Sequence, residues 1–207
     1  HGIPWSRMRV IPLAACLPSG RGSSVPQPRP YVLFVGHRAG HKNFQLLVSA
    51  FILDRSLADS VDIVCVGGNV IAIGEIPQSL SCRHVYAADV ELAAWYRHAI
   101  ALIYPSRDEG FGIPPLEAWQ EDCPVIHCGG GAVEEVVADA GWKVGADDPE
   151  ALASAVRTLH FDPSVRAALV AAGCRRRTKF SWDQCAQDHA DAYRALIGSR
   201  GDGPPTT

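Results

Sequence analysis

Short apolar runs alternate with longer amphipathic segments along most of the chain. The apolar runs are continuous rather than interrupted by polar residues, which is typical of parallel strands covered on both faces. The strong runs are Tyr31–Val35, Val61–Val66, Ala101–Tyr104 and Pro124–His127, and the weaker ones are Arg83–Tyr86 and Trp142–Val144. Because helix-length segments separate these runs, the pattern predicts an α/β fold with an open, doubly wound, mostly parallel sheet.

Capping residues indicate where several of the intervening helices begin. Asp148 and Asp162 each stand directly before a proline, and an N-cap aspartate followed by proline is a favourable helix start. Asp89 is expected to cap the helix that precedes the third strong run. Ser181 and Gln184 have the spacing of a capping box before the last amphipathic segment.

The two ends of the chain differ from its middle. Residues 1–29 contain one strand-like run, Met8–Pro12, and Gly20–Pro30 is rich in Gly, Pro and Ser, which indicates a linker. Residues 199–207 are expected to form a disordered tail. The compact domain is therefore predicted over residues 30–198.

Composition narrows the class of protein. The chain has 207 residues, is 47% hydrophobic and 20% charged, and carries a formal net charge of -3. These values exclude global disorder and argue against a dedicated nucleic-acid binder, which would normally be basic. Seven cysteines, an odd number without a C-x-x-C pair, favour reduced structural thiols, with a zinc site or a catalytic thiol as alternatives.

The most informative segment for chemistry is residues 105–117, which follow a predicted strand and enter a helix. In an open α/β sheet, ligands bind at the carboxyl ends of the strands. Gly110 and Gly112 would allow a tight turn and close approach of a ligand, and the helix start would offer free N–H groups to a diphosphate. Glu109 and Glu117 could accept hydrogen bonds from sugar and ribose hydroxyls. Alternatively, one is a surface carboxylate and the other a favourable first-turn carboxylate.

Residues 36–43 form a second strand-to-helix loop. Arg38 and Lys42 supply cations suited to phosphate oxygens, and a solvated basic loop is the alternative. The glycine spacing of this loop is not G-x-G-x-x-G, which argues against a nicotinamide dinucleotide fold. No pair of aspartates in D-x-D spacing offers a cradle for a divalent metal, so no metal site is expected.

Further glycine turns and charged groups remain open to two interpretations. Gly67-Gly68 and residues 129–131 each follow a predicted strand at the ligand-binding edge. Glu134 and Glu135 open the next helix, where they would either complement the helix dipole or contact a ligand. The basic cluster at residues 175–179 would either stabilise a helix C-terminus or contact an anionic membrane surface.

Taken together, these motifs resemble those of the group 1 (family 4) glycosyltransferases, specifically the C-terminal, donor-binding domain of their GT-B fold. The similar segments are YVLFVGHRAGHKNFQLLVSAF (31–51), VCVGG (64–68), LIYPSRDEGFGIPPLEA (102–118), PVIHCGGGAVEEVVADAG (124–141) and FSWDQCAQDHADAYRAL (180–196). The resemblance implies a Rossmann-like domain over residues 30–198. It also implies that residues 1–29 are the end of a missing N-terminal acceptor domain and the linker that follows it.

The resemblance implies a role for individual residues. The residues implied in catalysis are Lys42 and Arg38, which would neutralise the donor diphosphate, and Glu109, which would contact the transferred sugar. The residues implied in donor binding are Gly36, Gly67, Gly68, Tyr86, Gly110, Phe111, Gly112, Glu117 and Glu135. Within this set, Glu117 would hold the ribose hydroxyls, and Tyr86 would lie near the nucleobase.

The implied reaction is transfer of a sugar from a nucleotide diphosphate sugar, UDP- or GDP-linked, to a glycan or lipid-linked acceptor with retention of configuration. No permanently bound cofactor is implied, and the location would be cytoplasmic, with peripheral contact at the inner face of the membrane. The isolated domain is expected to be inactive. The alternatives are a non-catalytic nucleotide-sugar binding subunit of a split enzyme and a GT-B epimerase or glycan synthase.

Overall fold

A parallel β-sheet forms the centre of the molecule in the computed structural model, which describes residues 2–18, 24–25, 27–38, 40–68 and 76–198. The strands of this described part are β1 (Tyr31–Val35), β2 (Asp62–Val66), β3 (Cys82–Val85), β4 (Leu102–Tyr104), β5 (Val125–His127) and β6 (Trp142–Lys143). Their order is β3-β2-β1-β4-β5-β6, and each neighbouring pair is parallel. The predicted doubly wound, parallel architecture and all six predicted strands are therefore confirmed.

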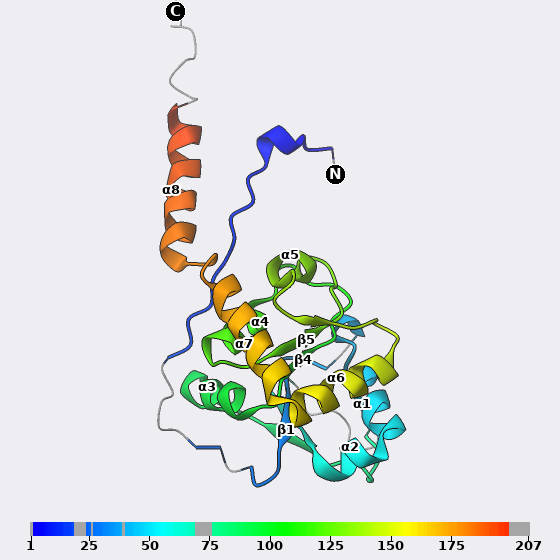
Figure 1. Cartoon of the computed structure of the whole chain (residues 1–207). Helices are drawn as coiled ribbons and strands as arrows, with labels where there is room; N and C mark the ends of the chain where they lie inside the picture. The colour runs from blue at the N-terminus through cyan, green and yellow to red at the C-terminus, as the bar shows by residue number, and fades with distance from the viewer. Residues whose placement is uncertain (1, 19–23, 26, 39, 69–75, 199–207) are drawn as a thin grey trace, which may run out of the picture.

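Helices cover both faces of the sheet (Figure 1). They are α1 (Phe44–Leu53), α2 (Arg55–Ser60), α3 (Asp89–His98), α4 (Ile113–Gln120), α5 (Val133–Val137), α6 (Pro149–Phe161), α7 (Pro163–Arg177) and α8 (Trp182–Gly198), with 3-10 turns η1 (Trp5–Arg7) and η2 (Gly40–Lys42). Helices α1, α2 and α6 pack on one face, whereas α3, α4 and α5 pack on the other. Helix α7 contacts both α4 and α6 and so links the two layers at the side of the sheet.

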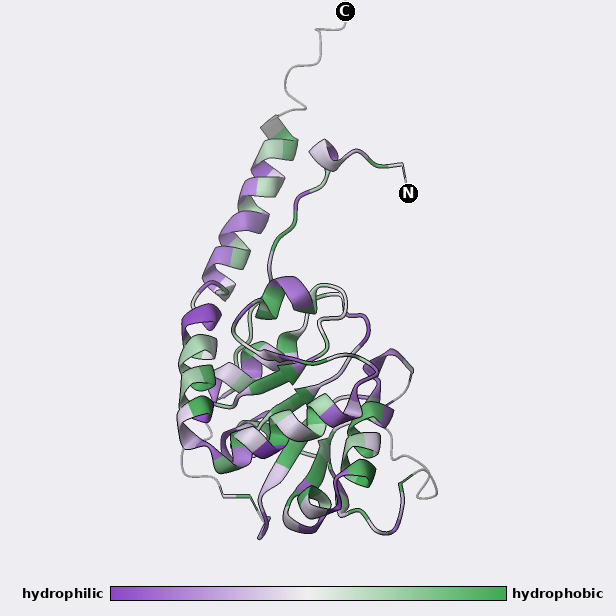
Figure 2. Ribbon diagram, turned by 45° about the vertical axis from the view of Figure 1, so that its right-hand side comes forward, coloured by the Kyte–Doolittle hydropathy of each residue, from purple (hydrophilic) through white to green (hydrophobic). Residues whose placement is uncertain are grey.

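The period of two along each strand divides the core between these layers. In β1, Val32 and Phe34 join the cluster under α1 and α6, whereas Leu33 points into the cluster under α3 and α4. All three side chains are buried, which explains why the sequence shows a continuous apolar run. Figure 2 shows the hydrophobic colour concentrated along the strands in the centre of the domain.

Two of the predicted helix caps are present, one is present in part, and one is absent. Asp148 accepts a hydrogen bond from the Ala151 amide, and Asp162 accepts hydrogen bonds from two amides of the first turn of α7, so both N-caps are confirmed. Half of the predicted capping box is present, since the Ser181 hydroxyl accepts from the Gln184 amide at 3.1 Å. The prediction for Asp89 is wrong. That residue is the first of α3, and the N-cap is Ala88, whose amide donates to the Glu91 carboxylate.

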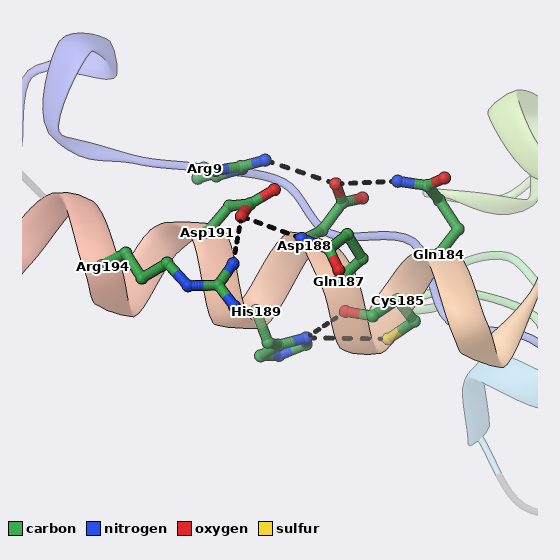
Figure 3. Close-up of polar contacts among 8 residues, drawn as sticks. All are labelled: Arg9, Gln184, Cys185, Gln187, Asp188, His189, Asp191 and Arg194. Atoms are coloured by element: carbon green, nitrogen blue, oxygen red, sulfur yellow. Dashed lines mark hydrogen bonds and ion pairs between the residues drawn. The ribbon is translucent and has the colours of Figure 1, made fainter.

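The N-terminal segment and α8 extend from the same end of the domain (Figure 1). Residues 8–12, where a strand-like run was predicted, form no strand. Arg9 instead forms an ion pair with Asp188 of α8 at 3.3 Å, and Figure 3 shows this contact among the polar interactions along α8. The predicted tail, residues 199–207, and parts of the predicted linker, residues 19–23 and 26, lie outside the described residues.

Within the described part of the chain, no helix is both long enough and apolar enough to cross a bilayer. Each of the seven described cysteines is a free thiol. The same described residues contain no group of three or more His, Cys, Asp or Glu side chains arranged to hold a metal ion.

Candidate functional site

The strand order places the loop after β1 and the loop after β4, both predicted to bind a ligand, beside each other. The chain winds in one direction from β1 to β3 and in the other from β4 to β6, so the order reverses between β1 and β4. At such a reversal, the loops at the carboxyl ends of the two strands separate and leave a crevice. A hydrogen bond from the Arg107 amide to the His41 carbonyl, 2.7 Å long, connects the loop after β4 with the loop after β1.

Lys42 and Glu109 meet at this edge. The Lys42 ammonium donates a hydrogen bond to Oε1 of Glu109 at 2.5 Å, and the side chains are only 19% and 12% exposed. The ammonium also lies 5.4 Å from the ring centre of Tyr104, the last residue of β4. Burial opposes ionisation of Glu109, but the hydrogen bond and charge of Lys42 together with neighbouring hydroxyl groups outweigh it and lower the pKa of the carboxyl. A largely desolvated cation and anion therefore occupy the point where the sheet order reverses.

The loop after β4 enters α4 through a glycine. Gly112 is the N-cap of α4 and has φ 105°, a left-handed conformation that favours glycine, and two prolines follow in the first turn. Around Gly110, no atom of the described residues lies within 4 Å of the position that a Cβ would take, so a ligand has room to approach the main chain. Gly110 does not have a positive φ, so its contribution is space rather than backbone conformation.

Glu117 is the fifth residue of α4, so the expectation of a first-turn position is wrong. Its Oε2 accepts a hydrogen bond of 2.8 Å from the hydroxyl of Tyr96, a fully buried residue of α3. Burial raises the pKa of Glu117 despite this bond. Tyr96 therefore fixes Glu117, a relationship that no sequence spacing indicated because the two residues lie on different helices.

The glycine turns after β1 and β2 are in direct contact. A Cβ at Gly68 would lie 2.6 Å from the carbonyl oxygen of Gly36, so only glycine fits there, and Gly68 also has φ 74°. Gly67 accepts a hydrogen bond from His84 at 3.1 Å, and His84 packs edge-on against Tyr86 with ring centres 4.6 Å apart. Tyr86 is 71% exposed beside these turns.

Helix α5 borders the site on the β5 side. The glycine turn before it packs against the loop after β4, since a Cβ at Gly131 would lie 2.6 Å from the Glu109 carbonyl oxygen. Glu134 forms an ion pair of 2.8 Å with Lys143, whereas Glu135 is exposed in the first turn of α5. Both carboxylates lie in the first turn of α5, where they complement the helix dipole, and contact with a ligand stays a prediction.

Arg38 lies on the α1 side of the same edge. Its guanidinium carbon is 5.9 Å from the ring centre of Phe44, the first residue of α1. The sulfur atoms of Cys65 and Cys82 are 3.9 Å apart. The pKa of the Cys82 thiol is lowered, first by its hydrogen bond with Cys65 and also by the nearby charge of Arg38. The Arg38 side chain is half-buried in this arrangement.

His127, at the carboxyl end of β5, is a polar residue that the sequence analysis did not select. Its side chain is 1% exposed, and neither ring nitrogen has a hydrogen-bond partner among the described residues. Burial lowers the pKa of His127 to about 4, so the imidazole is neutral at pH 7. The apolar context of the run Pro124–His127 could have indicated its burial, but not the missing partners.

The fold and the edge define a class of protein, a Rossmann-like domain whose glycine turns, helix N-termini and paired charges gather at the carboxyl end of a parallel sheet. The sequence profile of the family described as glycosyl transferases group 1 matches residues 29–162. The chain belongs to this family.

Individual relatives agree with this assignment. The chain is 31% identical to the D-inositol 3-phosphate glycosyltransferase of Streptosporangium roseum over 205 positions, which cover 88% of this chain and 47% of that protein. It is 34% identical to the O-antigen chain mannosyltransferase B of Escherichia coli over 111 positions, 54% of this chain and 29% of that protein. The chain spans about half or less of the length of these curated relatives.

Solved structures share the fold. Sucrose-phosphate synthase from Thermosynechococcus elongatus matches with a TM-score of 0.70 at 24% identity, over 89% of this chain and 52% of that one. The C-terminal domain of a group 1 glycosyl transferase from Francisella tularensis matches with 0.60 at 22% identity, over 73% and 87%. An Anabaena protein in complex with UDP and glucose matches with 0.66 at 18% identity, over 80% and 48%. The fold is therefore the Rossmann-like C-terminal half of a GT-B fold.

Proposed function

We propose that this chain is the donor-binding domain of a retaining glycosyltransferase that moves a sugar from a nucleotide diphosphate sugar to an acceptor hydroxyl. Lys42 neutralises the diphosphate of the leaving group, with Arg38 as a second cation nearby. Glu109 accepts hydrogen bonds from the transferred sugar, and Glu117 accepts them from the ribose. The main-chain amides of residues 110–112 face the phosphates at the start of α4.

The observation that carries this proposal is the Lys42–Glu109 pair. A cation and an anion in contact at the reversal of strand order suit a ligand that has a diphosphate next to a hydroxyl-rich group. In the free protein the Lys42 ammonium and the Glu109 carboxylate pair with each other. When the donor binds, the Lys42 ammonium contacts the diphosphate instead, and the Glu109 carboxylate accepts hydrogen bonds from the sugar hydroxyls.

The surrounding residues have narrower roles in the same proposal. Gly36, Gly67 and Gly68 let the donor approach the main chain at the ends of β1 and β2. Tyr86, exposed beside them, offers a ring to the nucleobase. Glu135 contributes an accessible carboxylate at the start of α5. No metal ion and no permanently bound cofactor enter this scheme.

The acceptor side of the reaction lies outside the domain. We assign residues 1–29 to the end of an N-terminal acceptor domain and the linker that follows it, and residues 30–198 to donor binding. Support comes from the relatives, since the chain covers 47% of the Streptosporangium roseum protein. The acceptor is a glycan or a lipid-linked sugar. Exposed Arg175, Arg177 and Lys179 support peripheral contact with an anionic membrane on its cytoplasmic side.

Calorimetric titration with UDP, GDP and inorganic diphosphate tests the proposal. We expect Lys42→Ala to weaken all bound diphosphates by at least ~1.5 kcal/mol, about tenfold, because a charge-assisted contact is lost. Glu117→Ala is expected to weaken only the nucleoside diphosphates, because inorganic diphosphate has no ribose. Lys179→Ala removes the same charge from an exposed position and serves as the control.

The outcomes separate the assignments. An affinity of Lys42→Ala equal to that of the Lys179→Ala control would refute the phosphate role. Equal weakening of inorganic and nucleoside diphosphates by Glu117→Ala would refute the ribose role. The titration also decides between uridine and guanosine. UDP appears in the complex of the structurally similar Anabaena protein, whereas one of the relatives is a mannosyltransferase.

A further inference from the structure

We propose that Arg176 and Phe180, at the corner between α7 and α8, are positioning residues for the donor site. They hold helix α5 and the loop after β4 in the arrangement that the diphosphate needs. The inference rests on the proposed function, because it concerns the geometry of that same site. Three sets of contacts carry it.

The first set joins Arg176 to α5. Nε of Arg176 donates a hydrogen bond to the Val136 carbonyl at 2.9 Å, and Nη2 donates to the Glu135 carbonyl. Helix α5 has only five residues, and its N-cap is Ala132, whose side chain has no group that could cap it. Its C-cap is Ala138, which has φ 49°. Such a short helix is marginal by itself, so the two hydrogen bonds from Arg176 supply partners that its last turn would otherwise lack.

The second set joins Phe180 to the loop after β4. The ring centres of Phe180 and Phe111 are 5.9 Å apart and the rings are nearly perpendicular, at 82°. The guanidinium of Arg176 lies 5.5 Å from the Phe180 ring centre. Phe111 stands between Gly110 and Gly112, so this anchor restrains a loop whose glycines leave the backbone otherwise free.

The third contact completes a closed path of contacts, the contact ring, between the loop after β4, α5 and the corner between α7 and α8. The Ala132 amide, at the start of α5, donates a hydrogen bond to the Glu109 carbonyl at 3.1 Å. Glu109 is two residues before Phe111, so the path runs from Glu109 to α5, on to Arg176 and Phe180, and back to Phe111. The residues assigned to the sugar and the phosphates are thereby fixed relative to α5 before a ligand arrives. Binding to fixed groups avoids the loss of conformational entropy that ordering a loose loop would cost.

The neighbouring arginines provide a matched control. Arg175, Arg176 and Arg177 all lie in the last turn of α7, where a positive charge is favourable. Arg175 and Arg177 are exposed, whereas Arg176 is half-buried against α5. Replacing Arg175 therefore removes the same charge from the same helix turn but leaves the ring of contacts intact.

The test compares Arg176→Ala, Arg176→Lys and Phe180→Leu with Arg175→Ala in the full chain. We expect the first three to weaken binding of UDP or GDP, and of inorganic diphosphate, by five- to tenfold in calorimetry. Lysine keeps the charge but cannot span two carbonyls, so it does not rescue the affinity. Arg175→Ala stays within twofold of the wild type. Amide hydrogen exchange is expected to accelerate selectively in residues 109–113 and 132–138.

Two further readouts separate positioning from stability and from the proposed function. Denaturant unfolding gives the folded fraction at the titration temperature. An affinity loss fully explained by that fraction overturns the inference, and so does wild-type affinity in Arg176→Lys and Phe180→Leu. If the wild-type chain binds no nucleoside diphosphate, the proposed function fails. In that case selective exchange in the two segments still supports the contact ring, and uniform exchange overturns it.

Discussion

At the scale of single residues, the two glutamates of the site differ because of their neighbours. Glu109 lies beside the Lys42 ammonium, which together with neighbouring hydroxyl groups outweighs burial and lowers the pKa of the carboxyl. Glu117 accepts a hydrogen bond from the neutral hydroxyl of Tyr96, but burial dominates and its pKa is raised. Identical side chains eight positions apart therefore differ in how readily they ionise. The pKa of Glu109 is lowered, and the pKa of Glu117 is raised.

His127 gives a prediction about stability and pH. Its pKa is about 4 in the folded chain, against an ordinary value of 6.5, because burial disfavours the charged imidazole. The unfolded chain therefore binds a proton that the folded chain does not between these values. The free energy of unfolding is expected to fall as the pH drops from about 6.5 toward 4, by roughly 3 kcal/mol at most.

Urea unfolding of the wild type and of His127→Leu at several pH values between 4 and 7 measures this effect. The leucine variant is expected to lose a large part of the pH dependence because the titrating group is gone. His98→Ala, at an exposed position, serves as the control and should keep the wild-type slope. An unchanged slope in His127→Leu would show that other groups cause the acid destabilisation.

At the scale of elements, the caps give a sharper prediction than the helix boundaries. Asp148 accepts a hydrogen bond from the Ala151 amide at 2.9 Å, so Asp148→Ala is expected to destabilise the domain by about 1 kcal/mol. Asp89→Ala is expected to cost only a few tenths of a kcal/mol, because Asp89 is the first residue of α3 rather than its N-cap, so the variant loses a favourable first-turn charge but no cap. Denaturant unfolding of the two variants tests the order, and a larger loss for Asp89→Ala would contradict it.

The elements themselves were largely predictable. The six strands predicted within the domain appear within one residue of their expected ends, because continuous apolar runs bounded by glycine, proline or polar residues leave few alternatives. The strand expected at residues 8–12 is absent, since a strand also needs a neighbour and that segment instead extends beside α8. A strand-like sequence pattern therefore forms a strand only where the tertiary structure places a neighbouring strand beside it.

At the scale of the whole molecule, the proposed division of labour has a direct consequence. The chain is expected to bind a nucleotide sugar but not to transfer the sugar to a glycan or lipid-linked acceptor by itself. The physical reason is that transfer needs the donor and the acceptor held in a fixed orientation. In the proposed function, this domain binds the donor only. Mass spectrometry after incubation with donor and acceptor measures transfer, and the same reaction with a longer protein carrying an N-terminal domain is the control.

The candidate donor-site residues could be proposed from sequence because they rest on local features, namely glycines and charges directly after apolar strands, and their roles stay predictions. The sequence alone also determined the fold class and family resemblance, since those follow from ordered motifs at a regular spacing. Only the tertiary structure decided the contacts between distant residues: Lys42 with Glu109, Tyr96 with Glu117, and Arg176 with α5. Such pairs depend on strand order and helix packing, which the whole chain determines together and no local spacing records.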